Sequence, residues 1–201
     1  MILALDIGNT NVTCGVYSGK KWVHTLRLPS TLNSWNQFST LKEFDITESA
    51  ISSVVPNLTQ VYIESIRNLF QIDAHIITCQ NSGVELLVDT PKDVGIDRIC
   101  NVIAAKEIVG TPAIVGDIGS ATNYDVVDEN GAFIGGAIAP GIEVAAHNLI
   151  ERAALLKETA FIVPVSAVGK TTESNLQSGI MLGAIDLVDG MFHRIMDEMK
   201  W

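Results

Sequence analysis

Two short segments of the chain place an aspartate, a glycine and hydroxyl- or amide-bearing residues in the same order. They are Asp6-Ile7-Gly8-Asn9-Thr10-Asn11 and Asp117-Ile118-Gly119-Ser120-Ala121-Thr122-Asn123. Each lies between two apolar stretches that are typical of β-strands. A glycine near the aspartate lets a phosphate approach the backbone closely, and the N–H and hydroxyl groups that follow can donate to phosphate oxygens. Each segment is therefore a candidate phosphate-binding hairpin.

The repetition of this hairpin indicates a duplicated structural unit. One copy alone is also explained as an ordinary Asx turn, but two copies in matching contexts favour a shared function. Two similar lobes with facing hairpins would enclose a ligand cleft. The carboxylates of Asp6 and Asp117 cannot face phosphate directly because both groups are negative. Mg²⁺, water or a monovalent cation would have to lie between them.

A third candidate is the segment Gly95-Ile96-Asp97-Arg98, at the expected start of a helix. The carboxylate of Asp97 could accept a proton from a substrate hydroxyl. The guanidinium of Arg98 could bind a substrate carboxylate through two parallel hydrogen bonds. The alternative is structural, because an acidic residue stabilises a helix N-terminus and the arginine would then be solvated.

The segment before the last predicted helix offers two threonines. Thr171 or Thr172 could cap that helix, or a hydroxyl there could contact substrate. Within the helix, Gly179, Gly183 and Gly190 are each unfavourable by roughly 1 kcal/mol. Close packing against another helix would explain these glycines, and so would a break in the helix.

Apolar periodicity along the chain predicts an α/β protein with mixed sheets. Predicted strands cover residues 2–5, 12–17, 22–28, 50–55, 74–78, 84–88, 113–115, 123–127 and 133–138. Predicted helices cover residues 97–109, 143–156 and 172–199, with a weaker helical stretch at 35–44 and a helix capped by Asn57 that runs to about residue 69. We expect two lobes, formed by residues 1–96 and 97–201.

Composition narrows the class of protein. The chain has 201 residues, 47% of them hydrophobic, which suffices for a buried core. Its formal net charge of -10 argues against nucleic acid or an anionic membrane as partner. The three cysteines show no metal-ligand spacing and fit a reducing compartment. There is neither a secretory signal nor an apolar run long enough to cross a membrane, so we expect a cytoplasmic protein.

Taken together, the motifs resemble those of the type III pantothenate kinase family. Besides the two hairpins, the matching segments are Ser52–Pro56, Pro91–Arg98, Gly135–Gly141, Gly169–Thr172 and Gln177–Gly179, all in family order. The resemblance implies a duplicated ASKHA fold, the fold of actin-like ATPases and ribonuclease H. It also implies a homodimer that phosphorylates pantothenate with ATP, the first step of coenzyme A biosynthesis. Mg²⁺ and a monovalent cation, K⁺ or NH₄⁺, are the implied cofactors.

The same resemblance assigns roles by position. Asp97 would be the general base, Arg98 would bind the pantothenate carboxylate, and Asp117 would bind the monovalent cation. The residues implied to bind substrate are Gly95, Ile96, Asp97, Arg98 and Thr172. Those implied to bind ATP are Asp6, Ile7, Gly8, Asn9, Thr10, Asn11, Val12, Thr13 and Ser120.

The chain also departs from the family pattern. Val88 stands where the family usually has a tyrosine in the pantothenate pocket, and Asn123 replaces a threonine. The family normally continues beyond residue 201 with a strand, a Thr-Gly-Gly loop and further helix, so we expect either a truncated chain or a diverged member. Two alternatives to the kinase follow: a catalytically weak or inactive homologue that acts as a binding or regulatory protein, and a different ASKHA enzyme, such as an acyl or sugar kinase or a phosphohydrolase.

Overall fold

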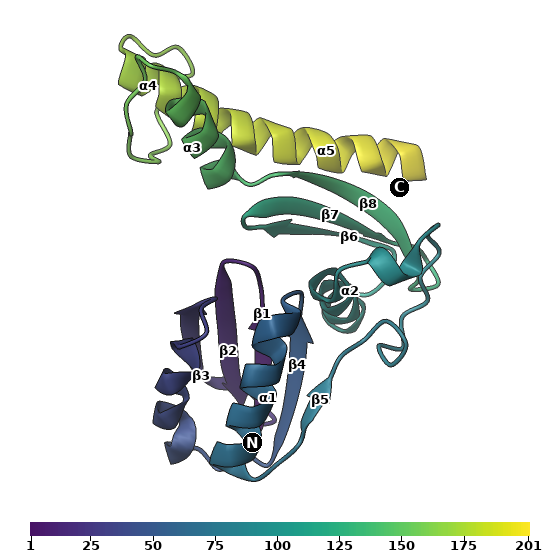
Figure 1. Ribbon diagram of the computed structural model, residues 1–201. Coiled ribbons are helices and arrows are strands. Elements are labelled where there is room, and N and C mark those ends of the chain that lie inside the picture. Colours follow the sequence, from purple (N-terminus) through teal and green to yellow (C-terminus); the bar gives the residue numbers. More distant parts are fainter.

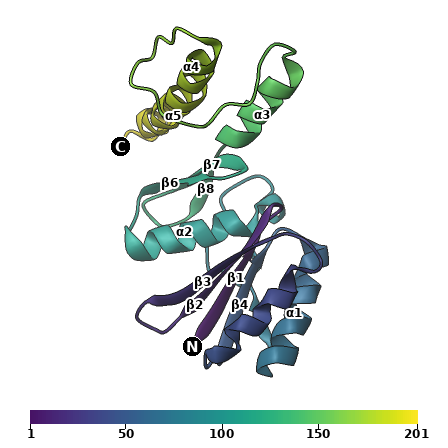
Figure 2. The same ribbon diagram turned by 90° about the vertical axis from the view of Figure 1, so that its left-hand side faces the viewer.

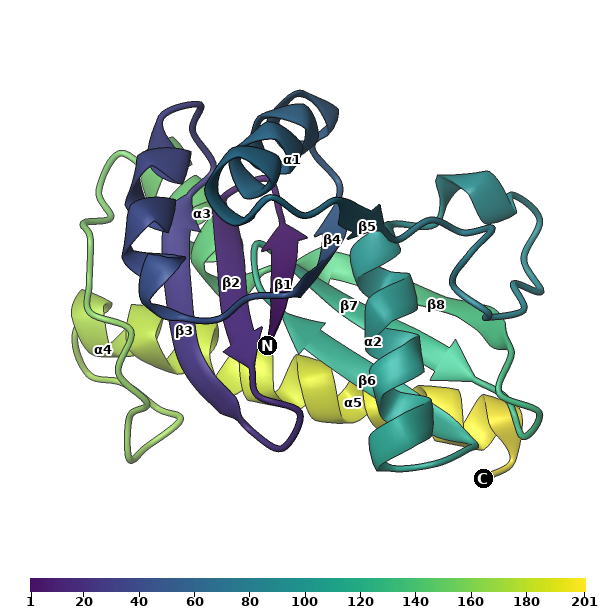
Figure 3. The ribbon, with the colours of Figure 1, turned by 90° about the horizontal axis from the view of Figure 1, so that it is seen from below.

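Five strands from the first 76 residues form a mixed sheet in the computed structural model, which describes residues 1–201 (Figure 1). The strands are β1 (Ile2–Ile7), β2 (Asn11–Tyr17), β3 (Trp22–Pro29), β4 (Glu48–Ser53) and β5 (Ala74–Ile76). Their order is β3-β2-β1-β4-β5, with β1 antiparallel to β2 and parallel to β4. Helix α1 (Pro56–Phe70) and the 3₁₀ helix η1 (Ser34–Glu43) cover one face (Figure 3).

The two faces of this sheet differ because side chains alternate along a strand. On β1, Leu3, Leu5 and Ile7 are buried and join a core of 14 buried residues that includes Tyr62 of α1. Asp6 points to the opposite face, which looks toward the rest of the chain (Figure 2). The alternation therefore aims the first candidate carboxylate away from the core.

A second sheet repeats the first three strands of the first. It consists of β6 (Ala113–Ile118), β7 (Ala121–Val127) and β8 (Phe133–Pro140), antiparallel and in the order β6-β7-β8. Helix α2 (Ile96–Ile108) covers one face, where Ile99 and Val102 pack in a small core with Phe133. On the other face the rings of Tyr124 and Phe192 pack in a T-shaped arrangement, with their centroids 5.8 Å apart. Phe192 belongs to helix α5 (Gly183–Met199). The expected α/β ASKHA fold, with its repeated hairpin, is confirmed.

The C-terminal part of the chain is helical. Helix α3 (Ile142–Arg152) ends four residues before the predicted boundary at residue 156, and a long loop follows. The predicted helix over 172–199 is confirmed as α4 (Thr172–Gln177), a π-helical turn η3 (Ser178–Leu182) and α5 in succession. Nothing lies within 4 Å of a Cβ added at Gly179, Gly183 or Gly190, so these glycines serve no close helix packing within the chain. Gly179 lies in the π-helical turn and Gly183 directly follows it, so these two glycines coincide with an irregularity of the helix.

Two further local predictions were wrong. Residues 84–88 form no strand: Leu86 makes only an isolated bridge to Phe133, and the chain then turns into the 3₁₀ helix η2 (Pro91–Asp93). Asn57 is not the cap of α1, because the helix already begins at Pro56, whose fixed φ suits the first helical position.

At the start of α4 the cap is Thr171. Its side-chain oxygen accepts a hydrogen bond from the backbone N–H of Ser174, and the Ser174 hydroxyl oxygen accepts one from the Thr171 N–H in return. Thr172, the other residue considered for this role, begins the helix and leaves its hydroxyl free of the cap. Thr171 is therefore the cap of α4. A substrate contact by Thr172 stays a prediction.

Helix α2 connects the two sheets. It contacts β4 of the first sheet and β6 and β7 of the second, and the expected boundary between residues 96 and 97 falls within its first turn. The division into residues 1–96 and 97–201 stays a prediction. None of the helices combines the length and the apolar character that crossing a bilayer requires.

Candidate active site

The turns of the two repeated hairpins meet. A backbone hydrogen bond closes each turn, from Gly8 N to Asn11 O at 3.0 Å in the first hairpin and from Gly119 N to Ala121 O at 2.9 Å in the second, which is one residue shorter. The hydroxyl oxygens of Thr10 and Ser120 are 3.0 Å apart and share a hydrogen bond across the gap between the lobes. The two candidate phosphate-binding segments therefore face a common space.

A cleft of about 640 Å³ opens beside this contact. Backbone and hydroxyl groups of both hairpins form one end, and side chains of α3 and the following loop form the other. It is lined by Thr10, Asn11, Arg27, Ile118, Gly119, Ser120, Ile142, Glu143, Val144, His147, Asn148, Phe161 and Met181. The volume is in the range of small-molecule sites, and the lining combines polar groups of the hairpins with the rings of His147 and Phe161.

Three carboxylates converge near the hairpins. Burial by the surrounding protein raises the pKa of the Asp6 carboxyl, and the negative charges of Asp97 and Asp117 raise it further. The Ser52 hydroxyl, which donates to Asp6 Oδ1 at 3.2 Å, acts in the opposite direction. Asn101 Nδ2 of α2 donates to Asp117 Oδ2 at 3.1 Å. The three carboxylates therefore concentrate negative charge near the hairpins.

Asp97 lies in the first turn of α2, next to Gly95 at the N-cap position. Its Oδ1 accepts a hydrogen bond of 2.9 Å from the backbone N–H of Arg98. A side chain at position 95 would collide with the same oxygen, so glycine is required for this arrangement. The carboxylate is half-buried and close enough to Asp6 to perturb it.

The guanidinium of Arg98 is held by Asp125, a fully buried residue of β7. Nε and Nη2 both lie 2.6 Å from Asp125 Oδ1, and the guanidinium carbon lies 5.2 Å from the centre of the Phe133 ring. Burial raises the pKa of Asp125, although the positive charge of Arg98 opposes this. The pair fixes Arg98 at the second sheet through Nε and Nη2.

Comparisons with known proteins agree with the motifs. The sequence profile of type III pantothenate kinase matches residues 2–194. The type III pantothenate kinase of Thermomicrobium roseum is 40% identical over 99% of this chain and 82% of its own length. That of Agathobacter rectalis is 38% identical over 98% and 81%. The chain belongs to the type III pantothenate kinase family.

A solved structure supports the fold of this family member. The crystal structure described as a conserved putative Baf family transcriptional activator from Campylobacter jejuni is similar with a TM-score of 0.58 and 22% identity. The similarity covers 94% of this chain and 78% of that one. At this identity the comparison concerns the fold alone.

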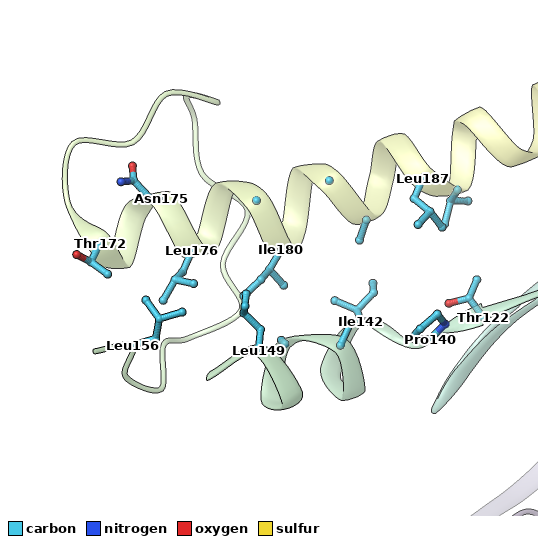
Figure 4. A pocket seen from close by; sticks show the side chains of 16 residues that line it. Thr122, Pro140, Ile142, Leu149, Leu156, Thr172, Asn175, Leu176, Ile180 and Leu187 are labelled. Atoms are coloured by element: carbon cyan, nitrogen blue, oxygen red, sulfur yellow. The ribbon is translucent and has the colours of Figure 1, made fainter. Parts of the chain in front are cut away.

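The structure places the residues assigned by family resemblance in several surroundings. Thr10, Asn11 and Ser120 line the cleft, and Asp97 lies near Asp6 and Asp117. The side chains of Ile7 and Val12 are buried in the core of the first sheet. Thr172 instead lines an apolar cavity of about 670 Å³ between α3 and the α4–α5 helix, where Leu176 points toward Leu156 and Ile180 points toward Leu149 (Figure 4). Neither Asp97 nor Arg98 lines that cavity.

Val88 occupies the position of the family tyrosine. It packs against the small core around Phe133, and one of its methyl groups lies 4.0 Å from a Cβ added at Gly135. The substitution therefore places an aliphatic side chain against the core that contains Phe133. Phe133 is also the ring that the Arg98 guanidinium contacts. Nothing else in the structure explains it.

The donor groups suit a cation that arrives with a nucleotide. No cluster of three or more His, Cys, Asp or Glu side chains in the chain is arranged as a metal site. Mg²⁺ bound with nucleotides takes one or two carboxylates and completes its shell with phosphate oxygens and water. Asp6 and Asp117, on opposite hairpins, provide carboxylates of this kind.

Sequence reasoning missed the polar partners of the predicted residues. Ser52, Asn101 and Asp125 each bind a candidate site residue from a different element. Asp125 had one available signal, since it interrupts the apolar end of a predicted strand. A charged residue at a buried strand position requires a partner of opposite charge.

Proposed function

We infer that this protein transfers the terminal phosphoryl group of ATP to the primary hydroxyl of pantothenate and so forms 4'-phosphopantothenate, the first step of coenzyme A biosynthesis. Family membership supports the reaction. The observation that carries the assignment to this site is the contact between the two hairpins at Thr10 and Ser120, with three carboxylates close by.

Phosphoryl transfer depends mainly on positioning and on neutralising charge. In our proposal the N–H and hydroxyl groups of residues 6–13 and of Ser120 bind the phosphates of ATP. Gly8 and Gly119 keep the backbone accessible there. The aromatic end of the cleft, with Phe161 and His147, accepts the base.

Asp97 acts as the general base. It orients the hydroxyl of pantothenate and takes its proton as the hydroxyl oxygen bonds to the terminal phosphorus of ATP. The bond from that phosphorus to the bridging oxygen breaks, and ADP leaves. Gly95 and Ile96 line the acceptor site beside this base, and Arg98, held by Asp125, pairs through its free edge with the pantothenate carboxylate.

Two cations complete the proposed site. Mg²⁺ would offset the charge of the phosphates, and K⁺ or NH₄⁺ would be held at Asp117. The raised pKa of Asp6 supports this proposal, because burial and, to a smaller extent, the charges of Asp97 and Asp117 disfavour the ionised carboxylate unless a cation offsets its charge. No role beyond charge neutralisation and orientation is required of either ion.

We further propose a cytoplasmic homodimer. Large apolar side chains are exposed along the C-terminal part of the chain: Ile138, Leu149, Leu155, Ile185 and Leu187 are between 47% and 91% exposed. A second copy would cover such a surface. Thr172, which lies away from Asp97 of its own chain, would then contact the pantothenate bound to the other subunit.

A coupled kinase assay tests the proposal. The purified protein with ATP, Mg²⁺ and pantothenate is expected to release ADP, faster with K⁺ or NH₄⁺ than without. Acyl and sugar acceptors serve as controls and should give no ADP above background. Absence of turnover with saturating ATP, Mg²⁺, K⁺ and pantothenate would contradict the proposal, and turnover with another acceptor alone would redirect it.

A further inference from the structure

Arg27 is an exposed arginine on the face of the first sheet that looks into the cleft. Its neighbour Leu28 is 2% exposed and belongs to the core, so the alternation along β3 directs Arg27 to the opposite face. The side chain lines the cleft together with Thr10 and Ser120. It is thus adjacent to the contact between the hairpins.

Strand register places Arg27 in a row with the first carboxylate. Asp6 pairs with Thr13 across β1 and β2, and Thr13 pairs with Arg27 across β2 and β3. Paired residues on neighbouring strands project from the same face. With strands about 4.8 Å apart, the backbones of Asp6 and Arg27 are separated by about 10 Å. A triphosphate chain that enters beside the hairpins can lie along this row.

The end of β3 is fixed to the first hairpin. Ser30 N donates to Thr10 O at 3.0 Å, and the Ser30 hydroxyl donates to Gly8 O at 2.5 Å. These bonds join the strand that carries Arg27 to the turn expected to bind phosphate. The base of the arginine side chain is therefore held at a constant distance from that turn.

Arg27 is also the one strong cation of the cleft. The chain contains 13 lysines and arginines, and no other member of this set lines the cleft. Arg67 and Arg98 form ion pairs with Asp73 and Asp125, whereas Arg27 forms none. An unpaired guanidinium beside backbone N–H groups and hydroxyls is suited to a polyanion, since its fork of donors matches phosphate oxygens.

We propose that Arg27 binds the polyphosphate of the nucleotide, extending the phosphate site beyond residues 6–13 and Ser120. The proposal rests on the nucleotide site proposed above and adds a binding residue to it. Arg27 supplies positive charge at one end of the row formed by Arg27, Thr13 and Asp6. Asp6, for which we propose a cation between carboxylate and phosphate, lies at the other end, two strands away.

The test compares Arg27→Ala and Arg27→Lys with Lys21→Ala. Lys21 lies in the turn at the far end of the same β2–β3 hairpin, so its substitution removes one positive charge about 20 Å from Arg27 along the strand. A fluorescent ATP analogue bound to each protein is displaced by ATP, by inorganic triphosphate or by adenosine. Thermal unfolding of the ligand-free variants confirms that each one folds.

Arg27→Ala is expected to weaken binding of ATP and of inorganic triphosphate by about tenfold or more, because it removes a charge-assisted hydrogen bond. Adenosine should bind as it does to the wild type, Arg27→Lys should retain part of the affinity, and Lys21→Ala should retain all of it. Unchanged triphosphate affinity in Arg27→Ala, or an equal loss for adenosine, would overturn the proposal. A wild type that fails to bind ATP would instead remove the proposed function itself.

Discussion

Thr10 and Ser120, which are 110 residues apart in the sequence, lie with their hydroxyl oxygens 3.0 Å from each other. The contact joins the turns of two hairpins that share an Asp-x-Gly pattern, each closed by a backbone hydrogen bond from its glycine N–H. The contact therefore brings together the two turns that we propose to bind phosphate.

Ser120→Ala tests the contribution of the second hairpin. The hydrogen bond to Thr10 is exposed, so its loss should change the free energy of unfolding by less than about 1 kcal/mol. Binding of ATP should weaken by about tenfold, because a hydroxyl that donates to a charged phosphate is lost. Denaturant unfolding and calorimetric titration measure the two effects. Ser39→Ala, at an exposed serine of η1 outside the cleft, should alter neither quantity.

Asp97→Asn tests the general base. The amide keeps the shape of the side chain but cannot take the hydroxyl proton, so kcat should fall by about 10²- to 10⁴-fold. Affinity for ATP should stay within about twofold of the wild-type value, an estimate that assumes no contact between Asp97 and the nucleotide. Asp93→Asn, in the exposed turn η2 just before α2, is the matched control and should keep wild-type rates. Retention of full activity in Asp97→Asn would exclude Asp97 as the base.

Asp6→Asn should stabilise the ligand-free protein near neutral pH. The folded-state pKa of Asp6 lies above its ordinary value, so the ionised carboxylate disfavours folding at pH values above that raised pKa. The stability gained by the variant should shrink as the pH falls through the raised pKa and should vanish below about 3.9, the ordinary pKa of aspartate. Thermal unfolding from pH 3 to 8 measures this difference.

The control for this measurement is Asp89→Asn, at an exposed position in the loop before η2. The same Asp6→Asn protein should bind ATP and Mg²⁺ poorly, since it loses a carboxylate that faces the phosphates. A ligand-free variant that is less stable than the wild type at pH 7 would show that burial and the neighbouring carboxylates do not disfavour the ionised form of Asp6.

Asp125→Asn should lower both stability and substrate affinity. It leaves the largely buried Arg98 without a counter-charge, at an expected loss of about 3 kcal/mol in the free energy of unfolding. Because Asp125 acts through Arg98, KM for pantothenate should rise more than kcat falls. Asp73→Asn removes one member of the exposed Arg67–Asp73 pair and should lower stability by less than about 1 kcal/mol. Equal losses in the two variants would contradict the assigned role of the buried pair.

Much of the fold could be predicted from sequence because strand alternation and the repeated Asp-x-Gly turns are local patterns. Residues 84–88 show the limit: their apolar alternation is that of a strand, but only one bridge to Phe133 forms before the chain turns at Pro91. Strand pairing depends on the neighbour that tertiary structure provides, which periodicity cannot report.

In the candidate site, too, local patterns could be predicted and contacts between distant residues could not. Asp6, Asp97 and Asp117 could be chosen from their turns, and the structure brings them together. The pairing of Arg98 with Asp125 and the position of Arg27 beside Thr10 depend on how α2 and β3 pack against the hairpins. Contacts between residues distant in sequence leave no spacing signal, so they were not predicted.

The central claim is that both hairpins bind the phosphates of one nucleotide. Hydrogen–deuterium exchange of the protein with and without a nonhydrolysable ATP analogue and Mg²⁺ tests it directly. The account predicts that backbone amides of residues 7–13 and of residues 118–122 become protected together, at the same ligand concentration. Protection of one hairpin alone, or of neither while the analogue is bound, would contradict it.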